Sequence, residues 1–186
     1  MLDLIIKNGK CYIDGELKEE DIAVKDKKIH KIGQISEEAK EIIDASDQTV
    51  LPGCIDTQTH FREPGSTDTE DLHSGSRAAV AGGITSVFEM PNTNPPTSNK
   101  KEFQRKLDLA KNRMYCNYAF YFGATADNAD DLASLKDLEG CCGIKLFAGS
   151  STGNLLVAEE DDIDKVFQNL SLIHISEPTR LLSISY

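Results

Sequence analysis

The residues best suited to chemistry lie in one short stretch, residues 53–65, which reads GCIDTQTHFREPG. Residues at positions i and i+2 of a β-strand point to the same side, so Asp56, Gln58 and His60 are expected to share one face. An imidazole beside an amide and a carboxylate suits a metal ion. The alternative is a core histidine whose hydrogen bonds are satisfied by its neighbours, and spacing alone does not decide between the two.

The charge balance limits the partners of this chain. It carries 20 Lys and Arg against 31 Asp and Glu, which gives a net charge of −11. So acidic a surface repels phosphate backbones and anionic lipid, which argues against nucleic acid and membrane as partners and leaves a small-molecule substrate. An anionic substrate would also be repelled, so it would need a cation placed locally in its site.

The cysteines and the N-terminal residues are used to predict the cellular compartment of the protein. The five cysteines are odd in number and contain no CxxC pattern, which argues against a zinc ribbon or a disulfide scaffold. We therefore expect reduced, mostly buried thiols in a cytoplasmic protein. The first residues do not form a signal peptide, and no apolar run reaches the ~18 residues of a membrane span. The cysteines are Cys11, Cys54, Cys116, Cys141 and Cys142.

Residues 1–51 predict a small β-rich domain. Short runs of alternating apolar and polar residues are separated by turn signals at Asn8-Gly9, Asp14-Gly15 and Lys25–Lys28. No residue of this segment suggests chemistry. We expect a sandwich-like β layer that precedes the part of the chain carrying the site.

After Pro52 the sequence alternates between strand and helix patterns, which predicts parallel βαβ units and an α/β fold. An eight-unit barrel requires about 250 residues, so residues 52–169 would form about half of one; an open doubly wound sheet is the alternative. Polar residues follow the strands at 56–65, 91–98 and 148–154, where such folds place their sites. The strands are expected at 54–60, 84–90, 116–125 and 143–149, and the helices at 69–82, 100–113, 128–139 and 159–170.

Three sequence blocks resemble one enzyme family. The first is DTQTHFREPG, the second SGSRAAVAGGITSVFEMPNTNPPTS and the third GIKLFAGSSTGN, and together they cover most of residues 52–157. They are similar, in the same order, to blocks of the amidohydrolase superfamily and of its dihydroorotase family in particular. The resemblance implies a partial TIM-type (β/α)8 barrel of about four βα units.

The resemblance also implies a zinc site with one or two Zn²⁺ ions. His60 matches a metal-binding histidine, and Lys145 matches the lysine that is carboxylated to bridge two metals; a solvated lysine at a strand end is the alternative for Lys145. Gln58 stands where the family's first metal histidine is expected, so it binds metal weakly, or one metal site is lost, or the protein is a non-catalytic homologue. Asp56 is expected to contact the metal ligands and not the metal itself.

The same resemblance assigns substrate-binding residues. Arg62 matches the arginine that binds the carboxylate of the substrate, and Asn92 matches the residue that assists it. A planar guanidinium forms two parallel hydrogen bonds with a carboxylate, and an acidic protein needs such a cation. A surface ion pair between Arg62 and Glu63, worth about 0–1 kcal/mol, is the alternative.

The function implied is that of dihydroorotase, the reversible conversion of L-dihydroorotate to N-carbamoyl-L-aspartate in de novo pyrimidine synthesis. One alternative is a related cyclic amidase, such as an allantoinase or dihydropyrimidinase. Another is a non-catalytic homologue that partners aspartate carbamoyltransferase. For the full-length protein we also consider a homo-oligomer.

The last segment, residues 170–186, does not continue the pattern. It resembles the translation of an adapter used in sequencing libraries, which predicts that the genuine sequence breaks near Asn169. The alternative takes His174 as a metal histidine of the family's fifth strand; we prefer the adapter, because that match spans the whole run. The later metal histidines and the proton-transferring aspartate would then be missing. No catalytic site is complete, and we expect the chain to be inactive alone.

Overall fold

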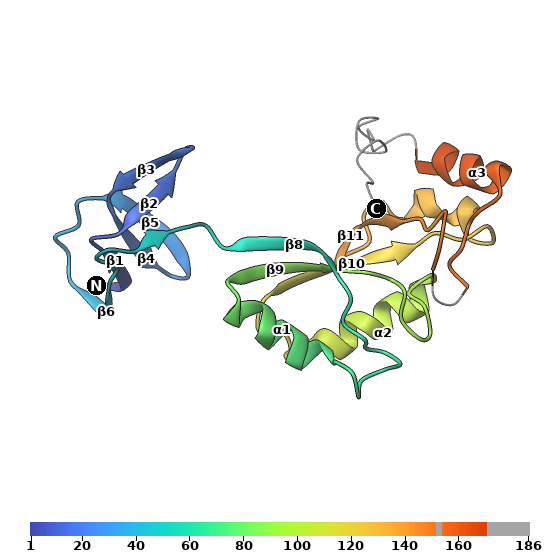
Figure 1. The fold of residues 1–186 in the computed structure, drawn as a ribbon, viewed down its shortest axis with the longest axis horizontal. Helices are drawn as coiled ribbons and strands as arrows, with labels where there is room; N and C mark the ends of the chain where they lie inside the picture. Colours follow the sequence, from blue (N-terminus) through green and yellow to red (C-terminus); the bar gives the residue numbers. More distant parts are fainter. Residues whose placement is uncertain (152–153, 171–186) are drawn as a thin grey trace. The chain divides into compact units, whose positions relative to one another are not determined.

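The computed structural model describes residues 1–151 and 154–170 (Figure 1). These residues form two compact units, one spanning Met1–Gly53 and the other beginning at Cys54. Apart from Leu170, the segment predicted to be an adapter, His174 included, lies outside the described residues.

The first unit consists of short strands in two sheets. One sheet has the strand order β5-β4-β1-β6, and the other has the order β3-β2-β7. Two hairpin turns place consecutive residues at positive φ, Asp14-Gly15 between β2 and β3 and Asp26-Lys27 between β4 and β5. This turn geometry matches the twist of antiparallel strands. The strands are β1 (Leu2–Lys7), β2 (Lys10–Ile13), β3 (Glu16–Glu19), β4 (Asp21–Lys25), β5 (Lys28–Gly33), β6 (Ala39–Asp44) and β7 (Thr49–Val50).

The second unit contains one sheet of four parallel strands in the order β11-β10-β9-β8. Helices α1 and α2 cover one face of this sheet (Figure 1). All four strands end at the same edge, so the loops after them lie together. The elements are β8 (Cys54–Thr59), α1 (Leu72–Ala81), β9 (Ile84–Glu89), α2 (Lys100–Ala110), β10 (Asn117–Gly123), η1 (Ala129–Leu135), β11 (Cys141–Lys145) and α3 (Glu160–Leu170). The predicted α/β fold with a preceding β layer is confirmed.

The boundaries of α1 differ from the prediction because side chains cap the helix. It begins at Leu72 rather than Thr69, since Asp71 accepts a hydrogen bond from the backbone N–H of Ser74 at 2.6 Å in a capping box. The helix ends before Gly82, and Gly83 follows at φ 85°. This left-handed conformation favours glycine.

The helix predicted at residues 128–139 is wrong in type and length. Residues Ala129–Leu135 form a 3₁₀-helix instead. The apolar residues are spaced by three, and a 3₁₀-helix has three residues per turn. Ala129, Leu132 and Leu135 therefore lie on one face, and all three are buried. The spacing of the leucines was a signal for this geometry.

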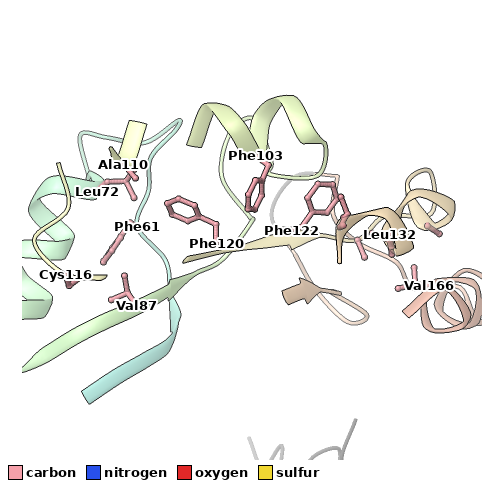
Figure 2. Close-up of a cluster of buried hydrophobic side chains, with 13 residues drawn as sticks. Phe61, Leu72, Val87, Phe103, Ala110, Cys116, Phe120, Phe122, Leu132 and Val166 are labelled. Carbon is pink, nitrogen blue, oxygen red and sulfur yellow. The ribbon is translucent and has the colours of Figure 1, made fainter. Parts of the chain in front are cut away.

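The core of the second unit is a cluster of aromatic and aliphatic side chains between the sheet and its helices (Figure 2). Phe103 of α2 is fully buried, and its ring centroid lies 6.4 Å from that of Phe120 and 6.1 Å from that of Phe122. Val87 of β9 and Leu72 of α1 are fully buried in the same cluster. This packing fixes α1 and α2 against the strands whose ends carry the site.

All five cysteines are free, but the prediction that most are buried is wrong. Cys11 and Cys116 are buried, Cys141 and Cys142 are half-buried, and Cys54 is exposed. Cys54 begins β8, the strand at one edge of the sheet, so no neighbouring strand covers it on that side. In the described part of the chain, no helix has both the length and the apolar character that crossing a membrane requires.

Candidate functional site

The loop after β8 is anchored by Phe61. Its ring is buried against α1, where Gly75 faces it. A Cβ at position 75 would overlap this ring, so glycine is required there despite its cost of about 1 kcal/mol in a helix. The buried ring fixes the backbone between His60 and Arg62, the two residues on which the predicted site depends most.

Glu63 anchors the same loop on the other side of Arg62. Its side chain is 9% exposed, and its carboxylate accepts hydrogen bonds from the Arg113 guanidinium at 2.7 and 3.1 Å. It also accepts one from the backbone N–H of Leu72 at 3.0 Å. The alternative in which Arg62 pairs with Glu63 is therefore wrong. Across residues 1–151 and 154–170, no carboxylate lies within ion-pair distance of Arg62, whose side chain is exposed.

Asn92 and His60 meet between the ends of β8 and β9. The Nδ1 atom of His60 lies 2.9 Å from Oδ1 of Asn92. An amide oxygen only accepts hydrogen bonds, so in the neutral ring Nδ1 carries the hydrogen and Nε2 carries the lone pair. The contact sets both the orientation and the tautomer of the imidazole, as hydrogen bonds to metal-binding histidines do.

An open cavity of about 460 Å³ lies beside this contact. Its volume falls within the usual range for small-molecule sites. The two loops that form it are joined by a hydrogen bond of 3.0 Å from the backbone N–H of Asn94 to the carbonyl of Pro64. The cavity brings together the predicted substrate-binding residues. Its lining consists of Arg62, Pro64, Ser66, Asn92, Thr93, Asn94, Pro96 and Asn154.

Lys145 lies at the same edge of the sheet but on another strand. It ends β11, where it pairs with Gly123 of β10, and its ammonium lies 5.1 Å from the ring centroid of Phe147. Because β11 and β8 are the two outer strands, three strand spacings separate them, or about 14 Å along the sheet. Lys145 is not among the described residues that line the cavity.

Gln58 and Asp56 are placed less favourably for metal binding than strand alternation predicts. Gln58 is exposed, and its backbone N–H donates to the carboxylate of Asp56 at 2.9 Å. The pairing of β8 with β9 is irregular between Asp56 and Thr59, and β8 ends before His60. Strict alternation therefore does not extend to His60. The roles of Gln58 and Asp56 at a metal remain predictions.

The described residues do not make up a complete metal site. Within residues 1–151 and 154–170, no three His, Cys, Asp or Glu side chains are grouped so that they could hold a metal ion. Zinc in proteins usually has three or four such ligands. The Nε2 atom of His60 is one possible ligand atom, so His60 as a metal ligand stays a prediction.

Sequence reasoning missed a buried ion pair below the site. Lys106 of α2 and Glu89 at the end of β9 are 0% and 1% exposed, and they contact each other. Burial raises the pKa of Glu89 to about 8, although the Lys106 ammonium lowers it, and burial lowers the pKa of Lys106. The available signal was the position of Lys106, three residues after Phe103 on the apolar face of the helix.

Comparison with known proteins identifies relatives that match most of the chain. Residues 49–163 match the Amidohydrolase family. A dihydroorotase of Methanosarcina mazei is 38% identical over 163 residues, which are 87% of this chain and 36% of the relative. An allantoinase of Escherichia coli O1:K1 / APEC is 42% identical over 149 residues, which are 80% of this chain and 33% of the relative.

A solved structure shows the same fold. The L-hydantoinase (dihydropyrimidinase) from Arthrobacter aurescens matches with a TM-score of 0.83 and 30% identity, over 92% of this chain and 39% of that chain. A D-hydantoinase from Thermus sp., at 24% identity and a TM-score of 0.73, shares the fold. The chain thus spans a third to two-fifths of the length of the relatives it matches.

Proposed function

The chain belongs to the amidohydrolase family, and from that premise we propose that the full-length protein is a dihydroorotase, a cyclic-amide hydrolase that interconverts L-dihydroorotate and N-carbamoyl-L-aspartate. The family typically binds a divalent metal. Relatives named dihydroorotase and allantoinase resemble the chain at similar identities. The choice of substrate therefore rests on the site.

The observation that carries the proposal is the guanidinium of Arg62 at an open cavity. Arg113 holds the neighbouring carboxylate of Glu63, so Arg62 has no ion-pair partner in the described part of the chain. With a net charge of −11, the protein repels anions except where a cation is placed to bind one. A ring substrate that bears a carboxylate, as L-dihydroorotate does, would use this cation.

The proposed chemistry is the hydrolysis of a ring amide. Water adds to the ring carbonyl, the C–N bond breaks, and the product carries a second carboxylate. Arg62 would bind the carboxylate that is present before and after the reaction. Asn92 would hold the His60 ring so that its Nε2 atom is directed away from the Asn92 side chain. We retain His60, Lys145 and Gln58 as the residues proposed to face the metal in the full-length protein.

A second candidate is a cyclic amidase whose substrate lacks a carboxylate. The allantoinase of Escherichia coli supports it, because its identity to this chain is 42%. Allantoin is uncharged, so Arg62 would then have no carboxylate to bind. The two candidates differ in whether ligand binding depends on the guanidinium.

Calorimetric titration of the 186-residue chain separates them. We expect L-dihydroorotate to bind, and Arg62→Met to weaken binding about tenfold or more, because hydrogen bonds to charged groups contribute about 1.5–3 kcal/mol. The matched control is Arg77→Met, which removes another exposed arginine, on α1. Allantoin binding that is equal in the wild type and Arg62→Met, without binding of L-dihydroorotate, would favour the second candidate.

Turnover tests the prediction that this chain is inactive alone. We expect no hydrolysis of L-dihydroorotate with or without added Zn²⁺, because the described residues contain no complete metal site. Zinc-dependent turnover by the purified chain would contradict this expectation. The same turnover, if lost in His60→Gln, would assign the metal to the site described above.

A further inference from the structure

The ion pair of Lys106 and Glu89 lies directly beneath the loop that carries Asn92. Lys106 extends from the buried face of α2, and its ammonium lies 5.2 Å from the ring centroid of Phe120. It contacts the Glu89 carboxylate and donates a hydrogen bond of 2.9 Å to the carbonyl of Met90. Glu89 ends β9 and Met90 begins the loop, so the cation is bound where strand becomes loop.

The backbone around Met90 is held on both sides. Its N–H donates to the carbonyl of Thr59 in β8 at 2.9 Å, and its C=O accepts from Lys106. Pro91 follows, and its ring fixes φ near −65°. The next residue is Asn92. The path from the ammonium to the Asn92–His60 contact is therefore short and contains few freely rotating bonds.

Stability does not explain a charged pair at this position. Moving a lysine and a glutamate out of water costs free energy, and apolar side chains of similar volume are often as stable or more so. The surroundings are apolar, since Phe103 of the same helix is fully buried. What apolar residues would not supply is a donor for the Met90 carbonyl, so that hydrogen bond is the distinctive contribution of Lys106.

We propose that Lys106 is a positioning residue, which holds the Met90 carbonyl so that Asn92 keeps His60 in its Nδ1–H tautomer with Nε2 directed away from Asn92. Its use in catalysis rests on the proposed function, but the positioning itself does not. Glu89 has a separate part in this arrangement. It balances the charge of the buried ammonium. The hydrogen bond to the Met90 carbonyl comes from Lys106 and not from Glu89.

The tautomer of His60 gives a spectroscopic test in the 186-residue chain. Free histidine favours the hydrogen on Nε2, so an Nδ1–H ring reports the contact with Asn92. The chain contains four histidines, labelled with ¹⁵N, and the His60 signals are assigned by their absence in His60→Gln. Spectra are recorded at a pH where the ring is neutral.

Two variants separate positioning from folding. In Glu89→Gln the buried amine of Lys106 can lose its charge and still donate an N–H to Met90, because burial lowers its pKa, and we expect the Nδ1–H tautomer to persist. The double variant Lys106→Met with Glu89→Gln leaves no unpaired charge in the core, and we expect it to fold, by circular dichroism, while His60 shifts toward the Nε2–H tautomer. Lys101→Met, at an exposed position on the same helix, is the matched control and should match the wild type.

Three results would overturn the proposal. The first is a folded double variant that keeps the Nδ1–H tautomer, and the second is loss of that tautomer in Glu89→Gln alone. The third is an unfolded double variant beside a folded Glu89→Gln, which would show that the ammonium is needed for the core itself. Because no ligand is used, a full-length protein that does not act on L-dihydroorotate would reject the proposed function, while an Nδ1–H ring in the 186-residue chain would leave the positioning role intact.

Discussion

The ion pair between Glu63 and Arg113 offers the most direct test of how the loop at the site is held. Arg113→Met removes both charge-assisted hydrogen bonds, at 2.7 and 3.1 Å, and leaves Glu63 with the hydrogen bond from the Leu72 N–H. The side chain of methionine keeps much of the arginine stem. The change therefore isolates the loss of the guanidinium.

The structure sets the size of the expected effect. A fully buried pair costs about 3–5 kcal/mol when one partner is removed, and an exposed pair contributes about 0–1 kcal/mol. Glu63 is 9% exposed but Arg113 is 36% exposed, so water reaches one side of the pair. We expect a loss of about 2 kcal/mol, which lowers the melting temperature by about 4–8 °C in a chain of this size.

The same change should weaken the proposed ligand site. Without Arg113, the Glu63 carboxylate is available to the adjacent Arg62, whose charge would then be partly neutralised. We expect Arg113→Met to reduce the affinity for L-dihydroorotate. Adding Glu63→Gln removes the competing carboxylate, so affinity should recover in the double variant.

The assay is a double-mutant cycle of Arg113→Met and Glu63→Gln, with unfolding followed by circular dichroism and affinity by calorimetry. Residues in direct contact show interaction energies of about 0.5–3 kcal/mol. An interaction energy below about 0.3 kcal/mol would refute the pairing. Unchanged affinity in Arg113→Met would refute the argument that the pair keeps Arg62 available.

Two further predictions concern the frame of the second unit. Phe103→Ala should lower the free energy of unfolding in urea by about 3–5 kcal/mol, because the Phe103 ring is fully buried. Phe167→Ala, at a residue that is 50% exposed, should lower it by about 0.5 kcal/mol or less. Equal losses in the two variants would contradict the core assignment. Hydrogen bonds from Ser74 hold the pKa of Asp71 below its ordinary value, so the charge of Asp71 stabilises the fold above that value and the effect is lost as pH falls through the lowered pKa. Asp71→Ala should cost about 1 kcal/mol at neutral pH, less in acid, and a cost independent of pH would contradict the capping role.

Much of the fold was predictable because its signals are local. Alternation of strand and helix patterns after Pro52 indicates parallel units, and the turn residues Asp14 and Gly15 mark a hairpin. Boundaries were less predictable, since α1 starts where Asp71 caps it. The 3₁₀-helix was not predicted although its apolar residues are spaced by three, because the same spacing also suits one face of an α-helix.

The site was predictable where short motifs carry it and unpredictable where distant residues hold it. Arg62 and Asn92 were selected from sequence, and the structure places both at one cavity. Arg113 was not selected, because its partner Glu63 lies 50 residues earlier in the chain. Nothing local in the sequence distinguishes this arginine from one exposed to solvent.

The sequence by itself determined which elements form and which side chains could do chemistry, since both depend on residue type and short-range spacing. Tertiary structure alone decided which carboxylate pairs with which cation. The parallel pairing of β8 and β9 brings His60 to Asn92, and the packing of α2 brings Lys106 under Met90. Burial then makes the contact of Lys106 with Met90 strong, because few competing partners or water molecules reach it, whereas the contact of His60 with Asn92 is only half-buried.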